Sequence, residues 1–149
     1  MSTIVGTNIE VTNLKYDSDT TSMIISNTGQ ITAQGEGTAT TNLQQGLAKA
    51  YGYAQHRTST VELKDSFNIS SWSDDATGQS TWNINSDMAN ATYTPVVSSS
   101  YDSTAGSSVV GCDEVWVTGA GVFKHDTFFG NGNFYDNDYV YATVHGDLA

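Results

Sequence analysis

The sequence has one cysteine, one proline and only five basic residues against sixteen acidic ones. A single cysteine, Cys112, excludes a disulfide within the chain and the two or four thiolates of the common zinc motifs. The net charge is −11 and the few basic residues are scattered, so a nucleic-acid-binding surface, which needs clustered lysine and arginine, is excluded as well. No apolar run approaches the ~20 residues of a membrane-spanning helix, so we expect no membrane insertion.

The N-terminus, residues 1–6, lacks the basic start and the apolar core of a secretory signal peptide. We therefore expect a chain that is made in the cytoplasm and is soluble there. Cys112 follows Val109, Val110 and Gly111, which favours a buried structural thiol. The length suits one main domain with an N-terminal appendage.

Polar and apolar residues alternate on both sides of a turn at residues 74–78 within the segment 61–95. This period of two predicts an antiparallel hairpin with one buried face. Trp72 and Trp82 flank the turn, so we expect them to pair across it. Packing in the core is the favoured role of these two tryptophans, and ligand stacking is the alternative.

We predict an all-β fold, an antiparallel sandwich or a small barrel, with a short N-terminal attachment region of strands and a linker. Residues 1–41 form the predicted attachment and oligomerisation segment, in which 35–41 is a linker, and residues 42–149 form the C-terminal β-sandwich. A short helix capped at Thr41 and Asn42 should lead into a strand with Tyr51 and Tyr53, residues 87–90 should form one helical turn, and Pro95 should mark an edge strand. Further strands are expected at 60–64, 67–73, 80–85, 92–98, 109–112, 114–118, 121–124 and 139–144.

The three histidines, His56, His125 and His145, lie far apart and show no metal-binding spacing. His125 and Asp126 together could form the histidine–carboxylate half of a nucleophilic triad. No serine lies in the turn motif that such a triad requires. We therefore predict surface or turn histidines, no catalytic residues and no cofactor. The chain is not expected to be an enzyme.

Three pairs of acidic residues are candidate calcium ligands, because hard cations prefer several oxygen donors. None has the spacing of a helix-loop-helix calcium site, and turn formation explains aspartates there equally well. We therefore predict no metal site and keep calcium as the alternative. The pairs are Asp17 with Asp19, Asp74 with Asp75, and Asp136 with Asp138.

The strongest binding candidate is the segment 128–135, FFGNGNFY, which sets aromatic residues among glycine and asparagine. The predicted contact residues are Phe129, Asn131, Asn133 and Tyr135. In the alternatives, Phe128 and Phe134 anchor the loop to the core, or the aromatic residues lie at a subunit interface.

The segments AKAY at 48–51 and VELKDSFNISSWSDDATGQSTWNINSDMANATY at 61–93 resemble a family of virion proteins of marine bacteriophages. Members of that family carry AKAW, an RDSFNVSS-like strand, a DNGTGDYT-like turn and an MPDANY-like element, and are usually described as tail-fibre-like. Here Tyr51 replaces the tryptophan, and the residues from 99 onward do not match. The resemblance implies a β-structured virion appendage, commonly a homotrimer.

From these features we expect a tail-fibre-like structural protein of the virion that contacts a glycan or protein of the host surface. Its N-terminal segment would bind other virion proteins. A decoration protein of the capsid is the alternative, and a glycan-degrading tail enzyme is a distant one, because that chemistry requires two carboxylates across a cleft.

Overall fold

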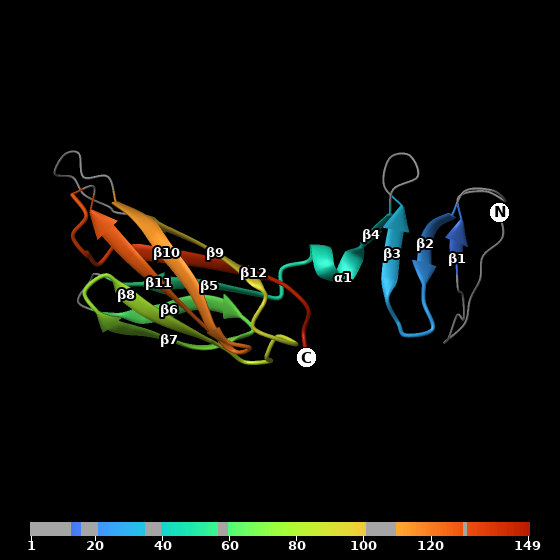
Figure 1. The fold of residues 1–149 in the computed structure, drawn as a ribbon, viewed down its shortest axis with the longest axis horizontal. Helices are drawn as coiled ribbons and strands as arrows, with labels where there is room; N and C mark the ends of the chain where they lie inside the picture. The colour runs from blue at the N-terminus through green and yellow to red at the C-terminus, as the bar shows by residue number, and fades with distance from the viewer. Residues whose placement is uncertain (1–12, 16–20, 35–39, 57–59, 101–109, 130) are drawn as a thin grey trace. The chain divides into compact units, whose positions relative to one another are not determined.

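The computed structural model divides into two compact units, Met1–Leu47 and Ala48–Ala149 (Figure 1). The residues that the structure describes are 13–15, 21–34, 40–56, 60–100, 110–129 and 131–149. The sequence predicts the division after Thr41, whereas the contacts separate after Leu47, because the short helix that follows Thr41 contacts strands of the first unit. No helix among the described residues is long and apolar enough to cross a membrane.

The first unit contains one antiparallel sheet with the strands in chain order. Helix α1 (Leu43–Gly46) begins after Asn42, whose side-chain oxygen accepts a hydrogen bond from the Gln45 amide at 3.2 Å, so the predicted cap is confirmed. The predicted linker is wrong at Thr40 and Thr41, which pair with β3; its residues 35–39 lie outside the described part. The strands are β1 (Asn13–Lys15), β2 (Thr21–Ile25), β3 (Ile31–Gln34) and β4 (Thr40–Asn42).

The second unit is a sandwich of two four-stranded antiparallel sheets and not a closed barrel, so the all-β prediction is confirmed. The β5 sheet has the strand order β6-β5-β12-β9, and the β8 sheet has the order β10-β11-β8-β7 (Figure 1). Their bounds are β5 (Ala50–Gln55), β6 (Glu62–Phe67), β7 (Ile69–Ala76), β8 (Gln79–Ile84), β9 (Thr94–Ser100), β10 (Val110–Gly119), β11 (Val122–Phe129) and β12 (Tyr139–His145).

The chain passes from one sheet to the other at Asn68, between β6 and β7. Asn68 has a φ of 55°, a left-handed conformation that asparagine tolerates. Its side-chain amide donates to the carbonyls of Lys49 and Ser86, and its oxygen accepts from the Ser86 amide. These bonds fix the corner from which the predicted hairpin of β7 and β8 begins.

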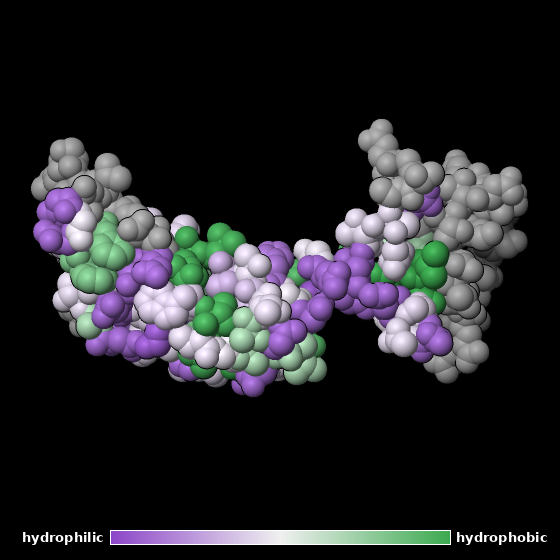
Figure 2. Space-filling model, viewed as in Figure 1, coloured by the Kyte–Doolittle hydropathy of each residue, from purple (hydrophilic) through white to green (hydrophobic). Residues whose placement is uncertain are grey.

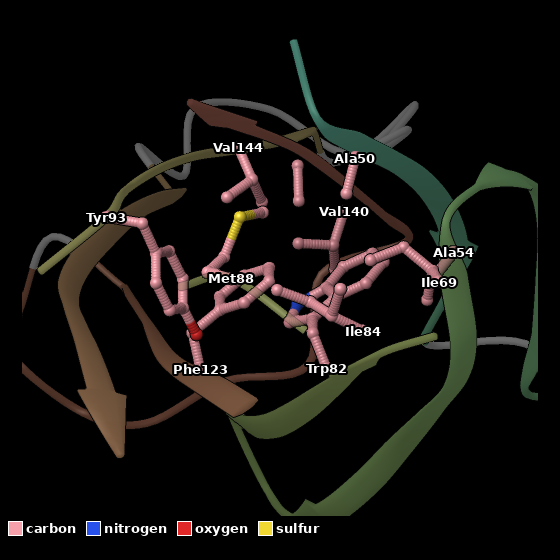
Figure 3. Packing of buried hydrophobic residues seen from close by; sticks show 11 residues of the cluster. Ala50, Ala54, Ile69, Trp82, Ile84, Met88, Tyr93, Phe123, Val140 and Val144 are labelled. Atoms are coloured by element: carbon pink, nitrogen blue, oxygen red, sulfur yellow. The ribbon is translucent and has the colours of Figure 1, made fainter. Parts of the chain in front are cut away.

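The core lies between the sheets, and the two sheets fill it differently (Figure 3). The β5 sheet contributes small residues such as Ala50 and Ala54, while the β8 sheet contributes Trp82 and Phe123, whose rings stack at 5.9 Å. Large side chains therefore lie against small ones, which allows close packing. The buried apolar residues are Ala50, Ala54, Ile69, Trp82, Ile84, Met88, Tyr93, Phe123, Val140, Ala142 and Val144.

Trp72 and Trp82 are direct partners across the hairpin, with ring centroids 6.0 Å apart, as predicted. Trp82 is fully buried and Trp72 packs at the margin of the core, so core packing is confirmed for the pair. Pro95 lies in β9 at the edge of the β5 sheet, also as predicted.

Four predictions about elements are wrong. The turn predicted at residues 74–78 is shorter, because Asp74 and Ala76 still pair with Ser80 and Gln79 in the hairpin. No helical turn forms at residues 87–90, because Met88 bridges to Leu148 and its side chain enters the core. Residues 109–118 do not form two strands, because β10 continues through an irregularity after Cys112. Strand β11 also runs further than predicted and takes in Phe128 and Phe129. The Cys112 side chain lies outside the described part of the structure.

The surface of the chain is mixed in character. On the face drawn in Figure 2, apolar areas are small and lie among polar and near-neutral residues. Such a surface agrees with a chain in which serine, threonine and asparagine make up about a third of the residues. A concentrated group of exposed aromatic rings is therefore informative where it occurs.

Candidate functional site

Five aromatic side chains lie on the outer surface of the β5 sheet. In β5, residues that alternate with the buried Ala50, Gly52 and Ala54 point outward, and these are Tyr51 and Tyr53. Their partners on the neighbouring strands continue the group, because Tyr51 pairs with Phe67 and Tyr53 pairs with Tyr141. We call this surface the aromatic face: Tyr51, Tyr53, Phe67, Tyr139 and Tyr141.

The rings of the aromatic face contact one another in two groups. Tyr53 stacks on Tyr141 with centroids 5.1 Å apart and planes within 9°, and it also contacts Tyr139 at 5.6 Å. Tyr51 stacks on Phe67 at 6.0 Å. Tyr51, Phe67 and Tyr141 are nevertheless 43%, 55% and 39% exposed. The rings are thus held by rigid strands and remain available to a partner.

Polar groups border the aromatic face. Glu62 and Lys64 form an ion pair on β6, and the Ser100 hydroxyl lies 3.4 Å from the Tyr141 hydroxyl. Desolvation and the neighbouring phenols of Tyr139 and Tyr141 raise the pKa of Tyr53, so its hydroxyl stays protonated at neutral pH. Stacked rings beside hydroxyl and charged groups combine apolar contact with hydrogen bonding. A sugar ring has matching groups, because its C–H faces are apolar and its hydroxyls form hydrogen bonds.

The four predicted contact residues fall in and beside one loop. Asn131 and Asn133 are exposed, and the Asn131 side chain accepts a hydrogen bond from the Asn133 amide at 3.1 Å. Tyr135 is half-buried; its amide donates to the Thr127 carbonyl, and its carbonyl accepts a hydrogen bond from the Thr127 hydroxyl. Phe129 ends β11, and its side chain is outside the described part. A binding role for these residues stays a prediction.

Phe128 and Phe134 form a pair at the base of this loop. Their backbones bridge, and their ring centroids lie 4.5 Å apart. Phe134 is 45% exposed, so it covers Phe128 and is not itself a core residue. The two rings pack on each other at the base of the loop, but neither belongs to the buried core cluster, so their anchoring of the loop to the core stays a prediction.

The prediction of surface histidines is wrong for His56 and His125, which are buried; His145 is exposed. His125 shares the inner face of β11 with Phe123, and its Nδ1 accepts a hydrogen bond from Trp82 Nε1 at 2.9 Å. Burial, together with the nearby His56, lowers the pKa of His125 to about 3. Asp126 accepts instead from Gln79, so the suggested half-triad does not form.

His56 lies beside two aspartates that come from distant parts of the sequence. Its Nε2 is 3.2 Å from Asp74 Oδ1 and 3.5 Å from Asp136 Oδ1. The imidazole is fully buried, whereas the two carboxylates are 30% and 31% exposed. Asp136 also accepts a hydrogen bond from the Gly78 amide at 2.6 Å. We call these three residues the His56–Asp74–Asp136 cluster; they have the donor atoms to hold a metal ion.

Asp74 and Asp75, one of the candidate calcium pairs, point in different directions in the structure. Asp74 and Asp136 meet across the sandwich end, but Asp75 points to the other face and binds Thr81, Ser73 and Lys124. Asp17 and Asp19 lie outside the described residues. Sequence reasoning missed His56 as the third member, and its only local signal was the alternation of Ala54 and His56 on the inner face of one strand.

Comparison with protein-family models, with curated proteins and with solved structures finds no match to this chain. The fold and the two groups of side chains define a β-sandwich with an exposed aromatic face on one sheet and a histidine–carboxylate cluster next to the β7–β8 turn.

Proposed function

We propose that this protein is a structural recognition component of a bacteriophage particle, a tail-fibre-like appendage without enzymatic activity. The N-terminal segment attaches it to other virion proteins, and residues 48–149 contact the host surface. Support comes from the resemblance of residues 48–51 and 61–93 to tail-fibre-like proteins and from the all-β fold, in which the first segment leads into β5 and the second contains β6, β7 and β8.

The aromatic face is the observation that carries the recognition role. Exposed tyrosines are rigid and amphipathic, so they give large contact area at a small cost in conformational entropy. The occupant we propose is an uncharged or weakly charged glycan of the host surface, because its ring faces stack on aromatic rings and its hydroxyls match the phenol and serine hydroxyls. The net charge of −11 disfavours a strongly anionic polymer.

Binding of the full chain to immobilised bacterial surface polysaccharides tests this role. We expect Tyr53→Ala and Tyr141→Ala each to weaken binding at least about fivefold, which corresponds to roughly 1 kcal/mol per contact residue. Trp116→Ala is the matched control, because Trp116 is an aromatic residue of β10 in the other sheet and alternates with the core-packing Val115 and Val117. Equal binding by all three variants would remove the aromatic face from the proposal.

The same assay separates the aromatic face from the loop that the sequence indicated. An Asn131→Ala and Asn133→Ala double variant that loses binding, with the tyrosine variants unaffected, would assign the contact to the loop. Antibody labelling of particles tests the virion location and shows whether the protein lies on the tail or on the capsid.

The homotrimer is a separate part of the proposal and needs its own measurement. Sedimentation at micromolar concentration is expected to give a species of three chains. A loss of this species in Tyr53→Ala and Tyr141→Ala would show that the aromatic face joins subunits instead of contacting a glycan. A folded monomer at all concentrations would contradict the trimer.

A further inference from the structure

We infer that the His56–Asp74–Asp136 cluster is a binding site for one divalent transition-metal ion of the zinc type. The three ligand atoms, one imidazole nitrogen and two carboxylate oxygens, lie within 4.8 Å of one another. They come from three separate segments: the residue after β5, the last part of β7 and the loop before β12. The inference does not depend on the proposed recognition role.

The His56 nitrogen and the two carboxylate oxygens are placed as ligands of one metal ion would be, and not as hydrogen-bond partners. Asp74 and Asp136 approach Nε2 to 3.2 and 3.5 Å, yet neither oxygen accepts a hydrogen bond from that nitrogen, and neither ring nitrogen has another partner among the described residues. With metal–ligand bonds of about 2.0–2.1 Å, the ligand atoms of a tetrahedral site lie roughly 3.3 Å apart. The metal ion lies along the lone pair of the ring nitrogen, so the carboxylate oxygens lie off that axis. The two nitrogen–oxygen distances, 3.2 and 3.5 Å, fit that arrangement.

A fully buried imidazole without a hydrogen-bond partner is a second, independent indication of a ligand. Leaving a buried donor or acceptor unsatisfied costs about 1–3 kcal/mol, so such groups call for an explanation. More buried atoms near the cluster have no hydrogen-bond partner among the described residues: Nε1 of Trp72, whose ring contacts His56, and both side-chain polar atoms of Asn137, which follows Asp136. A bound ion with its water would supply partners here.

The chemistry of the donors selects the class of ion. Imidazole suits zinc, copper, iron and nickel, whereas calcium and magnesium prefer oxygen ligands alone. Two carboxylates and a neutral imidazole carry a charge of −2, which a divalent cation neutralises. The half-exposed carboxylates leave a path for the ion and room for a water molecule as the fourth ligand.

The site would add to the bonds that already join these parts of the fold, such as that from the His56 amide to the Asp138 carbonyl at 3.0 Å. Asp136 already fixes the β7–β8 turn through the Gly78 amide, an outer-shell bond of the kind that orients metal-binding carboxylates. The residues just before Asp136 are the loop with Asn131, Asn133 and Tyr135. An ion at the cluster therefore fastens the base of this loop to both sheets.

Titration of the metal-free full chain with Zn²⁺, followed by calorimetry, tests the site. We expect one ion per chain, tighter binding of Zn²⁺ than of Ca²⁺ or Mg²⁺, and a melting temperature of the second unit that rises by roughly 10–15 °C at a hundredfold excess over Kd. Co²⁺ should give the visible absorption of a four-coordinate site with mixed nitrogen and oxygen ligands. This spectrum uses the unmodified chain, so it does not depend on how a variant folds.

Asp74→Asn and Asp136→Asn should each weaken Zn²⁺ binding at least about tenfold. Both replacements keep the shape of the side chain, and an asparagine at 136 can still accept from the Gly78 amide. Asp75→Asn is the matched control, because Asp75 is the next residue but points away from His56, and its affinity should stay within about twofold of the unmodified chain. No Zn²⁺ binding by the folded chain, Ca²⁺ binding alone, or equal loss in all three variants would overturn the inference.

Discussion

The two units are both antiparallel β-structures, but they differ in how they bury apolar surface. Unit Ala48–Ala149 encloses a core in which Trp82, Phe123 and Val140 are fully buried. In unit Met1–Leu47, none of the residues 23–34 and 40–47, whose exposure the structure gives, is buried, and Ile24 and Leu43 are 40% and 39% exposed. The described residues of this unit form one sheet of short strands, and none of them forms a second sheet opposite it.

The difference shows where the stability of the chain resides. Apolar burial contributes about 25 cal/mol per Å², so a sheet without an opposing layer gains little to offset its loss of conformational entropy. The sandwich obtains this layer from its own second sheet. In the attachment role proposed for the first unit, another chain supplies this layer.

The largest expected effect is that of Trp82→Ala. Trp82 is fully buried, stacks on Phe123 and binds His125, so its loss should destabilise the second unit by about 3–5 kcal/mol. Ile25→Ala, at a half-buried position of the first unit, should cost under about 1 kcal/mol. Hydrogen exchange read by mass spectrometry reports the two units separately. Equal costs in both would contradict the comparison.

Acid should destabilise the second unit through His125. The pKa of His125 is about 3 in the folded chain and 6.5 in the unfolded chain, so the unfolded chain binds the extra proton between these values. Stability is therefore fully present above pH 6.5 and falls by up to about 1.4 kcal/mol per pH unit below it. From pH 6.5 to pH 4.5 the loss should be about 2–3 kcal/mol.

Urea unfolding in a chelator-containing buffer measures this pH dependence. His125→Asn should flatten the slope, because an asparagine oxygen can still accept from Trp82 Nε1 but does not titrate. His145→Asn is the control, since His145 is exposed, and its slope should match that of the unmodified chain. The same slope in His125→Asn as in the control would refute the assignment.

Gly52→Ala should destabilise the sandwich by about 1–3 kcal/mol. A methyl group at Gly52 would lie 2.3 Å from the ring of Trp82, which is packed on all sides and cannot move away. The matched variant in the first unit is Gly46→Ala, where the methyl group would meet nothing within 4 Å. Because alanine favours a helix, this second change should be neutral or slightly stabilising. Thermal unfolding of both variants tests the contrast.

Local patterns explain which parts of the fold could be predicted. The alternation around residues 74–78 predicted the β7–β8 hairpin, and the two tryptophans predicted its register. The position of Asn42 before a short helical pattern predicted that it caps α1. Turn residues and period-two patterning act within a few positions, so they can be read directly. Met88 was mispredicted because its conformation depends on Leu148, at the far end of the chain.

The aromatic face and the metal cluster depend on strand order, which no local pattern gives. Tyr53 and Tyr141 become neighbours only because β12 inserts beside β5. His56, Asp74 and Asp136 likewise meet only when both sheets and the last loop are in place. The burial of His125 could have been predicted. Phe123, His125 and Thr127 are spaced two residues apart on one strand, so the side chain of His125 lies on the same buried face as that of Phe123.

The smallest expected effect concerns the division itself. The core cluster is formed entirely by residues of unit Ala48–Ala149, so a chain that begins at Ala48 should fold cooperatively, with a melting temperature within roughly 2 °C of the value for this unit in the full chain. Circular dichroism and the slow exchange of β12 amides measure this. A drop of more than about 5 °C would show that the first unit supplies part of the stability of the sandwich, and the two units would then have to be treated as one cooperative structure.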